Sequence, residues 1–290
     1  MKTIKDVIQQ YGQALQSLYD TRESSAITLL VLEEITGFSR ARIKAFPEDE
    51  LPAGAIEKLS AIATELQTGK PVQYVLGNTE FYGLNFLVNP ATLIPRPETE
   101  ELVDWALKES KRLTDNKQLN ILDIGTGSGC IAISLKKNLP GALVTAIDVS
   151  ATALKTAAQN AVINEVTVEF IEDSILDPKS GIERSNYDII VSNPPYVTLQ
   201  DKLHMHQNVT GFEPHLALFV PEENPLLFYE AIADLTVKTL LPGGLLFLEI
   251  NENLSKETIQ LLTLKGLSGI RLRQDMSGRD RMVKATLAAS

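Results

Sequence analysis

The sequence predicts an α/β fold in which helices cover a mostly parallel sheet, preceded by a small bundle of helices. After residue 119, apolar strand-like runs alternate with helical stretches, and such alternation produces a parallel sheet covered on both faces. The last two strands are separated only by residues 277–280, so we expect them to pair antiparallel. Before residue 70, apolar residues recur at helical spacing without a strand signal.

The N-terminal segment is expected to be entirely helical. Val7, Tyr11 and Leu15 lie one helical turn apart, which predicts a first amphipathic helix. Three more helices are expected, at 27–35, from about 40, and at about 53–66. Gly69 and Pro71 end the last of them. We therefore predict that residues 1–70 form a helical bundle.

Residues 71–97 have a different pattern and are predicted to link the bundle to the next domain. The runs 73–77 and 80–88 alternate with period two around a glycine, which indicates a β-hairpin. Prolines stiffen the chain that follows, at 90, 95 and 97. We expect a linker that packs onto a second domain covering residues 98–290.

The second domain is expected to alternate strands and helices. A helix opens at Thr99 and carries Trp105. The expected strands are 119–124, 142–147, 167–171, 188–192, 244–250, 270–274 and 282–286. Further helices are expected at about 129–138, 151–164, 225–240 and 255–264. A Rossmann-like sheet of seven strands that finishes in an antiparallel hairpin is the arrangement of class I methyltransferases.

The amino-acid composition limits which kinds of binding partner and which cellular compartment we expect. The chain has 27 basic and 37 acidic residues, a net charge of −10. Proteins that hold long nucleic acids usually have the opposite balance, because phosphate contacts need Lys and Arg. The single cysteine, Cys130, excludes an internal disulfide and indicates a reducing compartment. The chain shows neither a signal-peptide pattern nor an apolar run of membrane-spanning length, so we expect a cytoplasmic protein that binds no membrane.

A glycine-rich turn follows the first expected strand of the sheet. Its residues are Asp123, Ile124, Gly125, Thr126, Gly127, Ser128 and Gly129. Glycines let the backbone turn sharply and approach a ligand, and the helix N-terminus adds unpaired N–H donors. The Gly-x-Gly-x-Gly spacing differs from the dinucleotide fingerprint and resembles the version that binds S-adenosylmethionine. Such a turn alone is compatible with another nucleotide site or with a plain tight turn.

Acidic residues after the next two strands favour the S-adenosylmethionine interpretation. Asp148 ends the second strand, where a carboxylate suits two ribose hydroxyls. Asp173 and Ser174 follow the third strand, at the usual place for a polar group beside the adenine, although Asp173 is equally compatible with an ordinary loop acid. His204, His206 and His215 are expected to be solvated loop residues and not metal ligands, so we predict no metal site.

The strongest catalytic candidate is the tetrapeptide Asn193-Pro194-Pro195-Tyr196, which follows a buried strand pattern. An amide or exocyclic amine nitrogen is a poor nucleophile, since its lone pair is delocalised. The Asn193 side-chain oxygen and the Pro194 carbonyl can accept both of its N–H groups and turn the lone pair toward a methyl donor. Tyr196 can stack on the planar group and exclude water. The structural alternative is a rigid proline turn with a surface tyrosine.

The tetrapeptide does not identify the acceptor, since it occurs in methyltransferases that act on adenine, on guanine and on glutamine side chains. Four other segments do distinguish them. They read Pro-Val-Gln-Tyr-Val-Leu-Gly at 71–77, Glu-Phe-Tyr-Gly at 80–83, Leu-Ile-Pro-Arg-Pro-Glu-Thr-Glu at 93–100 and Phe-Glu-Pro-His-Leu-Ala-Leu at 212–218. Over about residues 70–285 the chain resembles the peptide chain release factor glutamine methyltransferases, the HemK/PrmC family.

The resemblance implies a function, a cofactor and partners. It implies methylation of the glutamine side-chain nitrogen in the Gly-Gly-Gln motif of class I release factors, with S-adenosylmethionine as donor. Asn193 and Tyr196 would hold that glutamine, and Asn193 would also face the cofactor beside the glycine turn and Asp148. The N-terminal bundle would be the family's usual first domain and dock the release factor. We expect a monomer without direct nucleic-acid contact.

Three positions depart from the family pattern. The stretch after Leu218 lacks the usual glycine-rich turn, Asn251 stands where a glycine is common, and Ser174 replaces an aromatic residue of some members. We expect the first two to affect rim loops and the third to leave the adenine contact open. Two alternatives remain: a methyltransferase for nucleic-acid amino groups, and a non-catalytic cofactor-binding adaptor.

Overall fold

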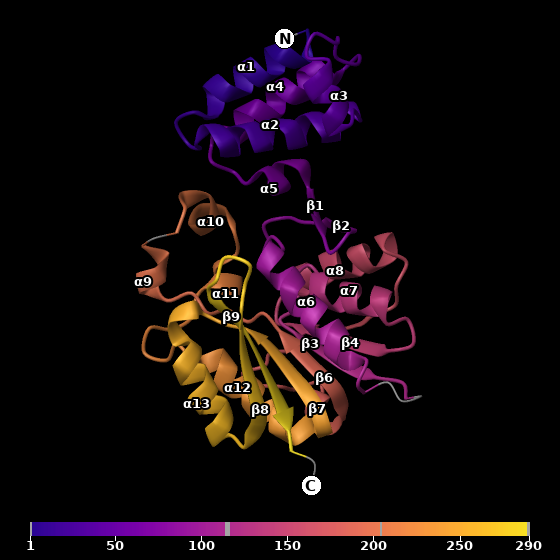
Figure 1. Ribbon diagram of the computed structural model, residues 1–290, viewed down its shortest axis with the longest axis vertical. Helices are drawn as coiled ribbons and strands as arrows, with labels where there is room; N and C mark the ends of the chain where they lie inside the picture. Colours follow the sequence, from indigo (N-terminus) through magenta and orange to yellow (C-terminus); the bar gives the residue numbers. More distant parts are fainter. Residues whose placement is uncertain (1, 114–116, 204, 289–290) are drawn as a thin grey trace. The chain divides into compact units, whose positions relative to one another are not determined.

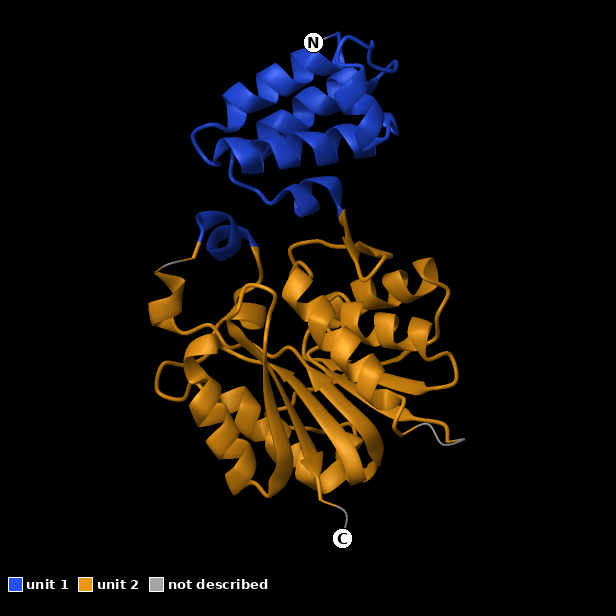
Figure 2. Ribbon diagram, in the orientation of Figure 1, with its two compact units in different colours: residues 1–77, 206–212 blue, residues 78–205, 213–290 orange. Residues whose placement is uncertain are grey.

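Two units make up the chain in the computed structural model, which describes residues 2–113, 117–203 and 205–288 (Figure 2). The first unit contains the chain up to Gly77 together with His206–Phe212, and the second contains Asn78–Met205 and the chain from Glu213 onward. Each unit has a hydrophobic core of its own. The three-part division predicted at residues 70 and 97 stays a prediction.

Helices pack around one apolar cluster in the first unit. They are α1 Ile4–Leu15, α2 Thr21–Thr36, α3 Arg40–Ala45, α4 Ala55–Leu66 and α5 Val72–Leu76, while α10 Gln207–Phe212 belongs to the same unit but contributes no residue to that cluster. Thr3 and Asp6 form a capping box at the start of α1, and Gly37 ends α2 in the left-handed conformation. The hydroxyl of Tyr11, fully buried, donates to the Leu59 carbonyl at 2.7 Å and so joins α1 to α4.

The run 73–77 is a helix, so the prediction that it forms a hairpin strand is wrong. Val72–Leu76 forms α5, preceded by Pro71 and ended by Gly77 at φ 79°. A five-residue apolar run is too short for its periodicity to separate helix from strand. The proline before it and the left-handed glycine after it are the helix boundary signals that decide the conformation.

The hairpin itself lies directly after Gly77, between β1 Asn78–Phe81 and β2 Leu84–Leu87. Tyr82 and Gly83 form its two-residue turn, both with positive φ, 51° and 71°. Two positive φ values match the right-handed twist of the flanking strands. The hairpin is therefore a short antiparallel pair whose tight turn contains one strained non-glycine residue.

Asn160, buried in α8 Ala151–Ile163, attaches the hairpin to the rest of the second unit. Its Oδ1 accepts from the Leu87 amide at 2.7 Å, and its Nδ2 donates to the Leu87 carbonyl at 3.0 Å. The same Nδ2 donates to the Ser128 carbonyl at 2.9 Å. One side chain thus holds both backbone groups of the strand end and the back of the glycine-rich turn.

Seven strands form the sheet of the second unit, as predicted, in the order β5-β4-β3-β6-β7-β9-β8. The strands are β3 Asn120–Ile124, β4 Leu143–Asp148, β5 Glu169–Glu172, β6 Tyr187–Ser192, β7 Leu240–Glu249, β8 Leu267–Gln274 and β9 Asp280–Leu287. All pairings from β5 to β7 are parallel, and β9 is antiparallel to both β7 and β8. The strand order reverses between β3 and β6, which is where open α/β sheets bind ligands.

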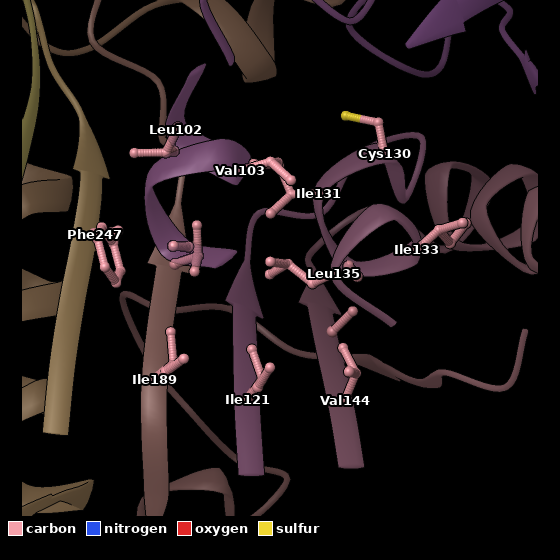
Figure 3. Packing of buried hydrophobic residues seen from close by; sticks show 14 of the residues in the cluster. Leu102, Val103, Ile121, Cys130, Ile131, Ile133, Leu135, Val144, Ile189 and Phe247 are labelled. Carbon is pink, nitrogen blue, oxygen red and sulfur yellow. The ribbon is translucent and has the colours of Figure 1, made fainter. Parts of the chain in front are cut away.

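Helices cover both faces of this sheet (Figure 1). The longer ones are α6 Pro97–Ser110, α7 Cys130–Asn138, α8 Ala151–Ile163, α12 Leu227–Thr239 and α13 Ser255–Leu264, and short ones are α9 Leu199–Lys202 and α11 His215–Leu218. On one face, Ile121, Val144 and Ile189 of three adjacent strands point toward α6 and α7 (Figure 3). On the other face, the core is built with α12 and α13.

Strand β7 begins at Leu240, four residues before the start predicted at 244. Leu240 pairs with Tyr187, and the register then shifts until Leu245 pairs with Ile189. The intervening residues include Gly243 at φ 78°, so the strand bulges between its two paired parts. Proline and glycine in this stretch look like a loop in the sequence, and long-range pairing of Leu240 overrides that signal.

No helix in the described parts of the chain has the length and apolar character that crossing a membrane requires.

We expect Asn160→Ala to lower the free energy of unfolding by about 3 kcal/mol, because the buried Ser128 carbonyl and the part-buried amide and carbonyl of Leu87 lose their hydrogen bonds to this side chain. Denaturant titration measures the change. The neighbouring Gln159→Ala is the control: Gln159 is exposed on the same helix, and its loss should cost less than about 0.5 kcal/mol. Equal effects of the two substitutions would contradict the assigned role of Asn160.

Candidate active site

A cavity of about 310 Å³ lies at the carboxyl edge of the parallel strands, within the size range of small-molecule sites. Loops after β3, β4, β5 and β6 line it, together with a segment near Leu93 and another near Leu216. The charged residues among its lining are Asp148 and Asp173, both acidic. The cavity therefore offers negative charge and backbone groups to a ligand.

The glycine-rich turn has two sides with different roles. Gly125, Gly127 and Gly129 all have positive φ, 73°, 56° and 83°. Gly125 and Gly127 line the cavity, and a Cβ on either would meet nothing within 4 Å. A Cβ on Gly129 would lie 2.9 Å from Ile133 Cδ1 and 3.1 Å from Ala157 Cβ. The first two glycines thus leave room for a ligand, and the third allows close helix packing.

The predicted cofactor residues Thr126, Ser128 and Gly129 belong to the glycine-rich turn but do not line the cavity. Thr126 is buried, and its hydroxyl donates to Asp123 Oδ2 at 2.7 Å. Asp123 is also buried, and this burial raises its pKa to about 7 although the Thr126 and Ala132 hydrogen bonds act in the opposite direction. These residues shape the turn from within.

Asp148 lies where the sequence predicted it, at the end of β4 and on the cavity wall. Its Oδ2 accepts from the Gly127 amide at 2.8 Å and its Oδ1 from the Ser150 amide at 2.9 Å. Burial raises the pKa of Asp148, and these backbone donors favour its ionised form. Because each carboxylate oxygen accepts more than one hydrogen bond, Asp148 retains capacity for two hydroxyls.

Asp173 and Ser174 also line the cavity, but the Asp173 carboxylate turns into its own loop. It accepts from the amides of Ser174, Lys179 and Ser180 and from the Ser180 hydroxyl. Burial opposes ionisation, yet these donors hold the pKa of Asp173 below its ordinary value. Its loop-stabilising role is visible, while contact of either residue with an adenine stays a prediction.

Asn193, Pro194 and Pro195 line the cavity at the end of β6, next to the glycine turn across the β3–β6 pairing. Asn193 Nδ2 donates to the Thr99 hydroxyl at 3.1 Å, and Thr99 in turn donates to Glu249 Oε2 at 2.6 Å. This arrangement turns Asn193 Oδ1, the acceptor atom of the amide, away from Thr99.

Tyr196 is held by buried groups and does not itself line the cavity. Its ring packs against the core between the sheet and α12, and its hydroxyl donates to Glu249 Oε1 at 2.9 Å. Burial, and then the Glu249 charge, raise the pKa of Tyr196 well above its usual value, so the phenol remains a hydrogen-bond donor.

Glu249, Thr99 and Asn251 were not predicted as site residues. Glu249 ends the apolar strand β7, and an acid inside such a run is the signal that could have found it. Asn251 was expected to affect only a rim loop, which is wrong: its Nδ2 donates to the Tyr196 carbonyl at 3.0 Å and to Asp201 at 2.7 Å. It holds the backbone of the tetrapeptide.

An ion pair between the buried Glu213 and the part-exposed Arg96 joins the proline-rich segment to the chain after the tetrapeptide. Glu213 accepts from the Ile94 amide at 3.1 Å and pairs with the Arg96 guanidinium. The side chain of Glu213 is nearly inaccessible, so breaking the pair would leave an uncompensated buried charge. The segments at 93–100 and 212–218, quoted above for their family resemblance, therefore meet in the structure.

The histidines give no metal centre among the residues that the structure describes. His206 stacks on Tyr19 of the first unit with ring centroids 5.9 Å apart, and His215 packs edge-on against Phe219. His204 lies outside the described residues. Within the described ranges, His, Cys, Asp and Glu side chains nowhere gather in a group of three or more that could hold a metal ion.

Two protein families match the chain. The Methyltransferase small domain matches residues 110–210, and the PrmC N-terminal domain matches residues 6–77. The release factor glutamine methyltransferase of Flavobacterium psychrophilum is 47% identical over 97% of this chain and 98% of its own length. That of Bacteroides thetaiotaomicron is 44% identical over 94% and 96%.

Solved structures show the same fold at lower identity. A methyltransferase from Pyrococcus furiosus covers 72% of this chain and 91% of its own, with a TM-score of 0.51 and 18% sequence identity. At that identity the likeness supports the fold and does not identify a substrate.

We expect Gly127→Ala to weaken cofactor binding and Gly129→Ala to lower thermal stability. An alanine at 127 must adopt φ near 56° and places its Cβ in the cavity, so affinity for S-adenosylmethionine should fall at least tenfold. An alanine at 129 meets Ala157, so the larger loss should be in thermal stability.

Calorimetric titration and thermal unfolding of both variants measure the two effects. Gly141→Ala serves as the control, since this exposed glycine lacks positive φ and a Cβ there meets nothing within 4 Å. If Gly127→Ala binds the cofactor like the unchanged protein, the glycine turn is not the cofactor cradle.

Proposed function

The chain belongs to the release factor glutamine methyltransferase family, and we propose that its target is the glutamine of the Gly-Gly-Gln motif in class I peptide chain release factors. It is an S-adenosylmethionine-dependent enzyme that methylates the side-chain nitrogen of a release-factor glutamine. The observation that carries this assignment is 47% identity over nearly the whole of both chains, first domain included. Class I factors and their Gly-Gly-Gln motif are the proposed refinement.

The residues of the cavity fit S-adenosylmethionine. Gly125 and Gly127 leave space for the methionine part, Asp148 retains acceptor capacity for the ribose hydroxyls, and the acidic lining suits a cationic sulfonium. When bound, the cofactor supplies an electrophilic methyl group. In this proposal Thr126, Ser128 and Gly129 act by shaping the turn, while Asp173 and Ser174 border the adenine.

We assign the reacting position to the Asn193 loop. Asn193 Oδ1 and the Pro194 carbonyl accept the two N–H groups of the substrate amide, and Pro195 keeps the loop stiff. These dipoles favour the positive charge that develops on the nitrogen as its bond to the methyl carbon forms and the carbon–sulfur bond breaks. The methylated nitrogen then loses its proton to solvent. Tyr196 does not line the cavity; in this proposal its ring supports the loop from the core side, where its hydroxyl donates to Glu249.

The first unit and the overall charge suggest how the partner is engaged. We assign docking of the release factor to the helical bundle of the first unit. A net charge of −10 favours a protein substrate over direct contact with nucleic acid. We further propose a monomer that acts in the cytoplasm, where a chain with the single thiol of Cys130 stays reduced.

Labelled S-adenosylmethionine incubated with the enzyme and a purified class I release factor should transfer one methyl group per factor. Replacing the glutamine of the Gly-Gly-Gln motif by alanine should abolish labelling, since the accepting nitrogen is gone. Label that survives this change would overturn the target residue, and transfer to ribosomal or transfer RNA in its place would favour the nucleic-acid alternative.

Asn193→Ala should lower kcat for release-factor methylation about 100- to 1,000-fold, because one of the two acceptors aimed at the amide is lost. The dissociation constant of S-adenosylmethionine should change by about twofold or less. Asn186→Ala is the matched control: this exposed asparagine precedes the same strand at its opposite end. Unchanged turnover in Asn193→Ala would remove Asn193 from the mechanism.

A further inference from the structure

A buried carboxylate lies beneath the Asn193 loop and contacts it twice. Glu249, only 2% exposed, accepts from Thr99 Oγ1 at one oxygen and from the Tyr196 hydroxyl at the other. Burial raises its pKa, while the two hydroxyl donors and the nearby Arg281 favour the ionised form. Each of its two oxygens accepts one of these hydroxyl protons, so the hydrogen-bond geometry makes Glu249 an acceptor at both.

The position of the Thr99 proton follows from this. A hydroxyl has one proton and two lone pairs, and a carboxylate has no proton to give. Thr99 must therefore donate its proton to Glu249, which leaves its oxygen as an acceptor for Asn193. Only the NH2 group of the Asn193 amide can occupy that position, so its oxygen is turned away from Thr99.

We propose that Thr99 and Glu249 are positioning residues that fix the direction of the Asn193 amide, so that its oxygen faces the amide to be methylated. The proposal rests on the proposed role of Asn193 and deepens it. A reversed Asn193 would bring two N–H donors against the N–H donors of the substrate amide. It would also place two oxygen acceptors together at Thr99 without a proton between them.

The geometry also links the two polar residues of the tetrapeptide. Through Thr99 the carboxylate orients Asn193, and directly it orients Tyr196. Asn251, two residues after Glu249 in the chain, donates a hydrogen bond from its Nδ2 to the Tyr196 carbonyl. The end of β7 thus positions the loop at the end of β6, although neither Glu249 nor Thr99 lines the cavity.

Thr99→Val keeps the shape of the side chain and removes its hydroxyl. We expect kcat to fall about 10- to 100-fold, with the dissociation constant of S-adenosylmethionine within about twofold of the unchanged protein. Thr99→Ser restores the hydroxyl and should keep kcat within about threefold. Thr236→Val is the control for stability alone: the hydroxyl of this fully buried threonine donates within its own helix, to the Ile232 carbonyl, so thermal stability should change without a comparable loss of kcat.

Glu249→Gln tests the carboxylate. A glutamine has one acceptor oxygen, so it satisfies only one of the two hydroxyls as an acceptor. We expect kcat to fall at least tenfold while cofactor affinity again changes by about twofold or less. Unchanged kcat in Glu249→Gln or in Thr99→Val would overturn the proposal.

A double-mutant cycle separates positioning from general support. Because Thr99 acts through Asn193, adding Thr99→Val to Asn193→Ala should lower kcat by no more than about twofold. Full additivity would overturn the proposal, since Thr99 would then act by another route. If the unchanged enzyme methylates no release factor, the proposed function itself is wrong. If it methylates a release factor and the cycle is additive, only the positioning role of Thr99 and Glu249 is wrong.

Discussion

Parallel pairing of β3 with both β4 and β6 is the constraint on which the site depends. Ile124 lies opposite Ile147 on one side and, on the other, pairs with Ser192. The residues that follow these strand ends must therefore leave the sheet side by side. They belong to the glycine turn, the Asp148 corner and the Asn193 loop, which lie far apart in the sequence. Register within the sheet thus assembles the cofactor and acceptor residues without any long connecting loop.

This dependence explains why much of the site was predictable from the sequence. In a parallel sheet the carboxyl ends of strands share one edge, so Gly125, Asp148 and Asn193 could be placed together once their strands were recognised. Local conformation was less predictable where a short run was ambiguous. The periodicity of residues 73–77 predicts a strand, whereas Pro71 and Gly77 bound a helix there. Gly243 and its neighbours predict a loop, whereas pairing of Leu240 with Tyr187 extends β7 through them.

The hydrogen-bonding support of the site could not be predicted in the same way. Thr99 and Glu249 are 150 positions apart, and Tyr196 and Glu249 are 53 apart. Side-chain partners at such distances follow from how α6 packs over the sheet, and periodicity does not report that packing. The hydrogen bond from the Asn251 side chain to the Tyr196 carbonyl also depends on tertiary packing and could not be predicted from sequence patterns. Sequence patterns locate elements and their ends, while tertiary packing decides which polar groups meet.

Two buried acids, Glu109 in α6 and Glu249 at the end of β7, differ in their partners, and the partners determine whether the acid mainly adds stability or orients a neighbouring group. Glu109 is paired with Lys284 at 2.7 Å, so opposite charges compensate each other and the pair joins α6 to β9. Glu249 faces two neutral hydroxyls, Thr99 and Tyr196, whose single protons have a defined direction. An ammonium group in their place would stabilise the charge more, but it would not specify which atom of Asn193 faces the cavity. A carboxylate satisfied by hydroxyls therefore gives up some electrostatic stabilisation and gains orientation of the reacting loop.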